Sequence, residues 1–215
     1  MWFRFPLGAI CCVLIAVSGS CFAQPIFDGC PVAGDAKGRQ VVALDRLKNR
    51  CTAPGSINPA VTLEAILAPG NDRTRWSQNM AATVEGYVAE VYVGGIETAN
   101  CYATDPLHRD THIAIALAPE VSAEPQTMIV EVTPRWRAII GRQGMDWSTE
   151  TLHNTAYHHW VRVSGWLLFD AEHASKSLNT ATRPGVWRAT AWEIHPITSI
   201  EPLNRPPGPP CLAMR

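Results

Sequence analysis

The stretch "TMIVEVTPRWRAIIGRQG" (residues 127–144) joins an extended apolar run directly to the start of a helix. Residues 127–132 are of types that favour strands. Thr133 is a typical N-cap residue, and proline suits the first helical position, so we expect a helix that begins at Pro134. The chain therefore changes from strand to helix at this point without a long loop.

Four further strands are predicted around this junction. Two precede it and two follow it, at residues 83–93, 110–119, 160–169 and 186–200. The first of them alternates between two faces and ends at a Gly–Gly pair, and the second alternates without a break.

The order strand, strand, strand, helix, strand, strand is that of the OB-fold, a five-stranded barrel with one helix between strands three and four. Gly86 and Gly165 stand in mid-strand, where tight barrels bend. The sequence therefore predicts a mainly β protein with a five-stranded OB-like barrel. Another small β-barrel or a β-sandwich is the alternative.

The rest of the chain is divided by its composition. Residues 24–80 are rich in Gly, Pro and Asn and contain two short segments with helical spacing, 41–50 and 58–68. Helices of that length need a surface to pack on. The predicted division is a signal peptide at 1–23, a helical and irregular N-terminal extension packed on the core at 24–80, the barrel at 81–203 and a proline-rich tail at 204–215.

Residues 1–23 predict export. They contain one positive charge, an apolar run and small residues, with cleavage expected after Ala23. A lipobox ending at Cys21 is the alternative. No later segment is apolar enough to span a membrane, so we expect a periplasmic or secreted protein. Removal of residues 1–23 leaves the 19 acidic residues in slight excess and no basic run, which argues against a general nucleic-acid binder.

Four of the seven cysteines remain after cleavage. They are Cys30, Cys51, Cys101 and Cys211. An even number in an exported chain predicts disulfides, here the local pair Cys30–Cys51 together with Cys101–Cys211. Free buried thiols are the alternative. The absence of Cys-x-x-Cys argues against a thiolate zinc site.

The segment "HRDTHI" places three ionisable residues at alternate positions. In an extended strand His108, Asp110 and His112 share a face, where they could bind a metal or form a base with its orienting partner. The alternative is the solvated face of a half-exposed strand.

Glu131 interrupts an apolar strand, where a carboxylate is costly unless it is paired or exposed. Strands two and three of an OB barrel are neighbours and form its usual ligand surface, so we expect Glu131 near His112. A salt bridge from Glu131 to Arg135 or Arg137 is the alternative.

Two further pairs complete the candidate site. Asp170 and His173 begin the loop between strands four and five. This loop and the loop that holds His108 flank the ligand groove of an OB-fold. The alternative is that Asp170 only caps a turn. Glu193 and His195 share an outward face, where Glu193 would approach Glu131 and two close carboxylates would bind a cation or keep one proton. The wet side of an ordinary sheet is the alternative for this pair.

Taken in order, these residues resemble an uncharacterised family of exported bacterial proteins with an OB-like fold. Its pattern is Asp-x-His-Ile, Met-Ile-x-Glu, Gly followed by Phe-Asp-x-x-His, and Glu-Ile-His-Pro, and "LKNR" (47–50) is similar to part of it. The matching positions are Asp110, His112, Ile113, Met128, Ile129, Glu131, Gly165, Phe169, Asp170, His173 and residues 193–196. The resemblance covers about residues 83–201 and implies an OB-like barrel and export, but no activity.

Three functions follow from these patterns. The first is an exported binding module whose groove, between residues 96–109 and 170–185, takes a small polar molecule, a glycan or an oligonucleotide. The second is a metal-assisted hydrolase, directed at phosphodiesters, in which the candidate residues bind a divalent metal and supply a base. The third is a cell-envelope interaction protein. The familiar nucleophile, zinc-protease and phosphate-loop motifs are missing, so the sequence leaves open whether the protein is an enzyme.

Overall fold

The computed structural model describes residues 26–181 and 184–204. The predicted signal peptide, residues 205–215 of the predicted tail and Cys211 lie outside the described residues.

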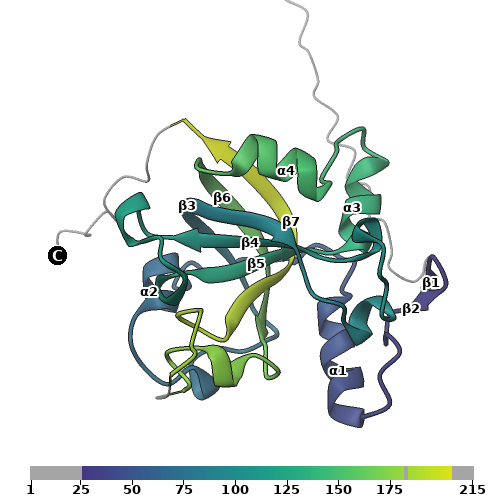
Figure 1. Ribbon diagram of the computed structural model, residues 1–215, viewed down its shortest axis with the longest axis horizontal. Helices are drawn as coiled ribbons and strands as arrows, with labels where there is room; N and C mark the ends of the chain where they lie inside the picture. Colours follow the sequence, from purple (N-terminus) through teal and green to yellow (C-terminus); the bar gives the residue numbers. More distant parts are fainter. Residues whose placement is uncertain (1–25, 182–183, 205–215) are drawn as a thin grey trace, which may run out of the picture.

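Five strands close into a barrel in the order β3-β4-β5-β7-β6 (Figure 1). The strands are β3 (Ala81–Val93), β4 (Thr111–Ala116), β5 (Met128–Val132), β6 (Trp160–Phe169) and β7 (Trp192–Leu203). All neighbours are antiparallel except β5 and β7, which are parallel. With a helix between the third and fourth strands, this is the OB-like barrel that the strand order predicts.

The connection between β5 and β6 contains two helices, not one. Helix α3 (Pro134–Gly141) begins as expected, because the Thr133 hydroxyl accepts a hydrogen bond from the Trp136 N–H at 3.3 Å and Pro134 occupies the first turn. Helix α4 (Thr149–Ala156) was not predicted. Its polar sequence, "TETLHNTA", buries only Leu152 and Ala156, which leaves little apolar periodicity to recognise.

The alternation in β3 changes sides at a β-bulge. Val84 and Val88 are buried in the core, but the register shifts between Val88 and Glu90, so Val91 is buried and Glu90 is exposed. The single alternation predicted for 83–93 is therefore wrong after Val88, because a bulge inserts one extra residue and so exchanges the two faces of the strand beyond it.

Gly86 and Gly165 lie where other atoms approach the barrel backbone closely. A Cβ added at Gly86 would lie 2.7 Å from Leu63, and one added at Gly165 would lie 2.3 Å from the Pro196 carbonyl oxygen. Both glycines are therefore required by close packing. Leu63 belongs to α2 (Leu63–Leu67), which docks its buried side chains into the barrel core.

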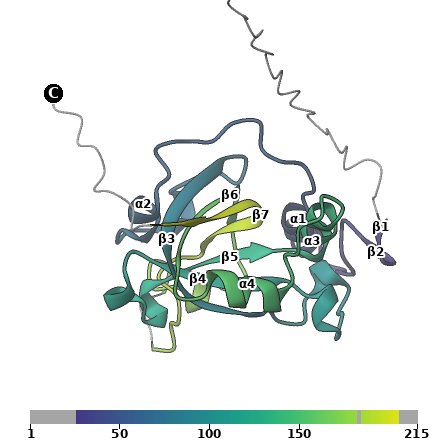
Figure 2. The same ribbon diagram turned by 90° about the horizontal axis from the view of Figure 1, so that it is seen from above.

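The N-terminal extension lies along the barrel and contacts it at separate points. Helix α1 (Arg39–Lys48) and the hairpin of β1 (Ile26–Phe27) and β2 (Cys30–Pro31) lie toward one end, near α3, whereas α2 lies toward the other (Figures 1 and 2). Between α2 and β3, the buried carboxylate of Asp72 accepts hydrogen bonds from the Thr190 hydroxyl and the Ala191 N–H, each at 2.8 Å. These bonds fasten the extension to the start of β7.

The disulfide prediction is wrong. Cys30 is bonded to Cys101, with Cα atoms 5.7 Å apart. Because Cys30 and Cys101 are bonded to each other, both predicted pairs are excluded. Cys51 is also disulfide-bonded. The physical reason is the path of the chain after α1. The Asn49 amide donates to the carbonyls of Val32 and Ala99, which brings the segment before Cys101 to Cys30, whereas the next residues run to β6, where Trp166 donates to the Thr52 carbonyl.

Candidate functional site

Four of the predicted site residues lie on the outer face of β4, β5 and β7. His112 is directly opposite Glu131 in the antiparallel register of β4 and β5. Val130 pairs with Ile194 in the parallel register of β5 and β7, which places Glu193 and His195 beside Glu131. The prediction that Glu131 lies near His112 and Glu193 is therefore confirmed by the register of the three strands.

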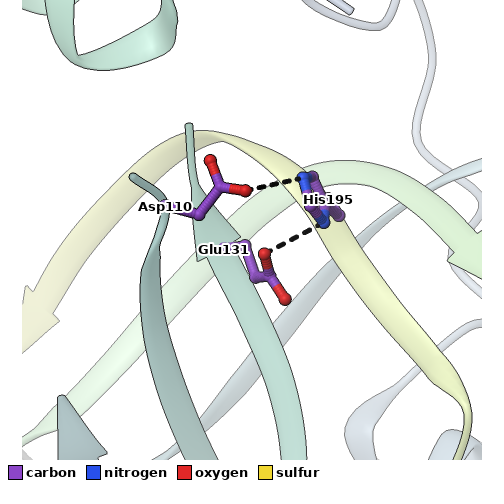
Figure 3. A group of neighbouring side chains, drawn as sticks. All are labelled: Asp110, Glu131 and His195. Carbon is purple, nitrogen blue, oxygen red and sulfur yellow. Dashed lines mark ion pairs between the residues drawn. The ribbon is translucent and has the colours of Figure 1, made fainter. Parts of the chain in front are cut away.

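His195 is the centre of this group and is fully buried. Its Nδ1 lies 3.2 Å from Glu131 Oε2 and 3.3 Å from Glu193 Oε2, and its Nε2 lies 3.9 Å from Asp110 Oδ2 (Figure 3). The second carboxylate oxygen of Glu131 lies 3.2 Å from His112 Nε2. We call Asp110, His112, Glu131, Glu193 and His195 the carboxylate–histidine cluster.

Arg188 joins the remaining predicted pair to this cluster. Its guanidinium lies 2.6 Å from Glu193 Oε1 and 3.5 Å from Asp170 Oδ2, and His173 Nδ1 bonds to the same Asp170 oxygen. The other oxygen of Asp170 accepts the backbone N–H groups of Glu172 and His173. Asp170 is therefore both a turn cap and a member of the ionic network.

Lys48, the last residue of α1, is buried and close enough to the cluster to interact with the charges of Glu131 and Glu193. It is 2% exposed, and its ammonium lies 2.6 Å from Glu97 and 3.6 Å from Glu172. Glu97 belongs to the loop between β3 and β4. A lysine is rarely buried to this degree unless it is paired. The ion pair with Glu97 therefore joins the end of α1 to the loop between β3 and β4.

Burial makes the wet-face alternative wrong for this group. Glu193 and His195 have at most 1% of their surface exposed, and Asp110 and Glu131 have 2%. The salt-bridge alternative for Glu131 is also wrong. Arg135 donates to Asn49 and to the Cys30 carbonyl, and Arg137 donates to backbone carbonyls and Thr111.

The charges in the cluster follow from burial and proximity. Burial disfavours both Glu131⁻ and His112⁺, but their attraction outweighs it, so the pKa of Glu131 is held far below its usual value and that of His112 is raised to about 9. Burial raises the pKa of Asp110 to about 6. Burial, with Glu131 nearby, also raises the pKa of Glu193. For His195, burial opposes the charge, but Glu131 outweighs it and raises the pKa.

Some buried polar atoms of the cluster accept or donate no hydrogen bond within the described residues. They are both carboxylate oxygens of Asp110, Glu131 Oε2, and the Nε2 atoms of His112 and His195. Buried side-chain polar atoms nearly always have such a partner. The lack of hydrogen bonds at the Asp110 carboxylate and at His195 Nε2 is therefore unusual for an ordinary structural network.

His108 does not join the cluster, so the prediction that it shares a face with Asp110 and His112 is wrong. Asp105 and Pro106 start a 3₁₀ turn that contains His108, and β4 begins only at Thr111, so the strand alternation does not extend to it. Instead, His108 Nε2 lies 2.6 Å from Asp28, and Nδ1 lies 3.4 Å from Asp105.

Two surface pockets lie near the cluster but are not lined by it. The first, of about 380 Å³, is formed by the hairpin, residues 99–108 and the start of α3, and contains the disulfide; we call it the disulfide pocket. The second, of about 460 Å³, lies between β3, Leu107 and α4. No described residue of 170–185 lines either of these two pockets, so neither of them is the groove predicted between residues 96–109 and 170–185. The Asp170–Arg188 contact holds that loop against the barrel instead.

Two important residues of the network were not predicted. Lys48 falls in the "LKNR" segment of the family pattern, which was a usable signal. Arg188 falls in the strand predicted at 186–200, but β7 begins only at Trp192, so Arg188 lies in an irregular segment and only the fold identifies its role.

No protein-family model matches this chain, and no curated protein is significantly similar to it. Within residues 26–181 and 184–204, no helix has the length and apolar character needed to cross a membrane. The Cys30–Cys101 bond is of a kind that persists in oxidising compartments, which is compatible with the predicted location.

Proposed function

We propose that the chain is an exported OB-type binding module that holds a small polar ligand, neutral or cationic, in the disulfide pocket. The observation that carries this proposal is the position and size of the pocket. It lies on the loop between the first two barrel strands, one of the two loops that flank OB ligand surfaces. Its volume of about 380 Å³ falls within the range of small-molecule sites.

The polar groups of the pocket favour this class of ligand. Asp28 and Asp105 flank the imidazole of His108, and both carboxylates are more than half exposed. Phe27 adds an aromatic ring over which the Arg135 guanidinium lies at 5.9 Å. The carboxylates at the rim would repel a phosphate backbone, so a sugar or another hydroxyl-rich or amine-bearing molecule fits better than an oligonucleotide.

The disulfide supports binding by holding the walls of the pocket together. Cys30 belongs to the hairpin and Cys101 to the opposite loop, so their bond joins the two sides. A wall that is already ordered does not have to be ordered by the ligand, which lowers the entropic cost of binding.

A panel of neutral sugars, amino sugars and single-stranded DNA would test this proposal, with NMR shifts of the Asp28 and Asp105 backbone amides of the pocket as the readout. We expect a neutral or amino sugar to shift these signals and DNA to have no effect. His108→Ala should abolish the binding, and His159→Ala, at an exposed histidine outside the pocket, should retain it. The proposal would be rejected if no sugar bound at millimolar concentration, or if His108→Ala bound the sugar as tightly as the wild type.

The geometry does not favour the metal-assisted hydrolase. A hydrolytic metal keeps an open position for water and substrate. Asp110, Glu131 and His195 are buried, and neither of the two pockets reaches them.

A further inference from the structure

Three members of the carboxylate–histidine cluster, Asp110, Glu131 and His195, converge from separate segments. They lie just before β4, on β5 and on β7 respectively (Figure 3). Each offers one ligand atom, and these three atoms lie within 4.8 Å of one another. All three residues are at least 98% buried.

The buried atoms without hydrogen-bond partners point to a missing cation. Neither oxygen of the Asp110 carboxylate accepts a hydrogen bond, and His195 Nε2, which faces Asp110 at 3.9 Å, has no hydrogen-bond partner within the described residues. A buried carboxylate without donors is destabilising. A metal ion between Asp110 and His195 would satisfy both groups at once.

The neighbouring residues hold the ligands as outer partners of a metal usually do. Glu193 Oε2 lies 3.3 Å from His195 Nδ1, which leaves Nε2 as the free nitrogen, and Arg188 holds the other Glu193 oxygen. His112 pairs with Glu131 Oε1, whereas Oε2 of Glu131 lies 3.2 Å from His195 Nδ1 and has no hydrogen bond within the described residues. Histidine ligands of metals characteristically have a carboxylate on their second nitrogen.

We propose that Asp110, Glu131 and His195 bind one divalent transition-metal ion, of the zinc class, in a buried site on the outer face of the barrel, where the ion has a structural role. One imidazole and two carboxylates are donors that suit Zn²⁺ and its neighbours, whereas Ca²⁺ takes six to eight oxygens. Metal–ligand distances of about 2.0–2.2 Å require the three side chains, whose ligand atoms lie within 4.8 Å of one another, to move inward around the ion. The two positive charges balance the two carboxylates.

The site has a structural purpose that the strand pairing suggests. The parallel contact of β5 and β7 has a single register pair, Val130 and Ile194, whereas the neighbouring antiparallel contacts have several. An ion bound by Glu131 of β5 and His195 of β7 would bridge this short contact.

The test uses the mature protein, dialysed against a chelator and titrated with Zn²⁺ or Co²⁺. We expect one bound ion per chain by elemental analysis, a higher unfolding temperature, and visible Co²⁺ absorption of a nitrogen–oxygen site. Asp110→Asn should lose at least about tenfold in metal affinity, and Glu193→Gln, which affects a positioning residue, about 10–100-fold. Asp35→Asn, at an exposed carboxylate, should bind the metal like the wild type.

Two results would overturn the proposal. One is a folded wild-type protein that binds no Zn²⁺ or Co²⁺ at millimolar concentration. The other is Asp110→Asn that binds as tightly as the wild type, which would mean an adventitious ion only. If Asp110→Asn does not fold, the NMR signal of His195 Nε2 in the wild type decides, because an unchanged shift on metal addition also rejects the site. His108→Ala should bind metal normally, so this test is independent of the disulfide pocket.

Discussion

The guanidinium of Arg188 lies 2.6 Å from Oε1 of Glu193, and each side chain is only 1% exposed. Arg188 comes from the irregular segment before β7, and Glu193 comes from the strand itself. The pair therefore holds that segment against the outer face of the barrel and connects Asp170 to the carboxylate–histidine cluster.

Removing this guanidinium should destabilise the fold strongly. Arg188→Gln leaves Glu193 and Asp170 buried without their cation, which typically costs about 3–5 kcal/mol. Urea unfolding measures the change, with Arg39→Gln on the exposed start of α1 as the control. A decrease in the free energy of unfolding of less than about 1 kcal/mol would show that Lys48 and the histidines neutralise the carboxylates without Arg188.

Gly94 and Gly95 are a matched pair for testing the position of His112. A Cβ at Gly94 would lie 2.4 Å from His112 Nε2, whereas a Cβ at Gly95 has no atom within 4 Å. Gly94→Ala should displace the His112 ring from Glu131 and lower the unfolding free energy by about 1–3 kcal/mol. Gly95→Ala should change it by less than about 0.5 kcal/mol. Equal effects of the two substitutions would contradict the assigned His112 position.

The disulfide assignment can be checked by peptide mapping under non-reducing conditions. A cross-linked peptide with Cys30 and Cys101 is expected, and a Cys30–Cys51 peptide would show that the assignment is wrong. The bond closes a loop with a sequence separation of 71 residues. The free energy of unfolding of the double variant Cys30→Ser/Cys101→Ser should therefore be about 4 kcal/mol lower, because the unfolded chain regains the entropy that the bond removes.

The Asp170–His173 pair should give a pH-dependent contribution to stability. Burial opposes the charge on Asp170, but the hydrogen bond from His173 outweighs it and holds the pKa of Asp170 below its usual value. The hydrogen bond to Asp170 raises the pKa of His173. The Asp170 contribution is present above about pH 4 and is lost as the pH falls. The His173 contribution is present below about pH 6.5 and is lost as the pH rises through the raised pKa.

Unfolding experiments across pH 3–9 would measure this dependence. His173→Gln should remove the His173 part of the stability that the wild type loses above about pH 6.5. The part that comes from His112 and His195, whose pKa values are also raised, should remain. His159→Gln should leave the profile unchanged. An NMR titration that places the His173 pKa at or below about 6.5 would contradict the pairing.

Local patterns were sufficient for most of the barrel. Thr133 and Pro134 mark the strand-to-helix junction, because capping chemistry acts between residues only a few positions apart. Alternation with period two placed His112, Glu131, Glu193 and His195 on one face, because neighbouring side chains of a strand point to opposite sides. The same rule failed at His108 and beyond Val88, since a 3₁₀ turn and a bulge interrupt the extended backbone there.

The sequence by itself determined the strand order, the start of α3 and the face that carries the ionisable residues, because these depend on short-range backbone geometry. Only the tertiary structure decided that this face is buried from solvent. Lys48 of α1 and Arg188 of a loop reach it from distant parts of the chain, and no periodicity within one strand records which segment packs over it. The pairing of Cys30 with Cys101 was decided in the same way, by the path of the extension around the barrel.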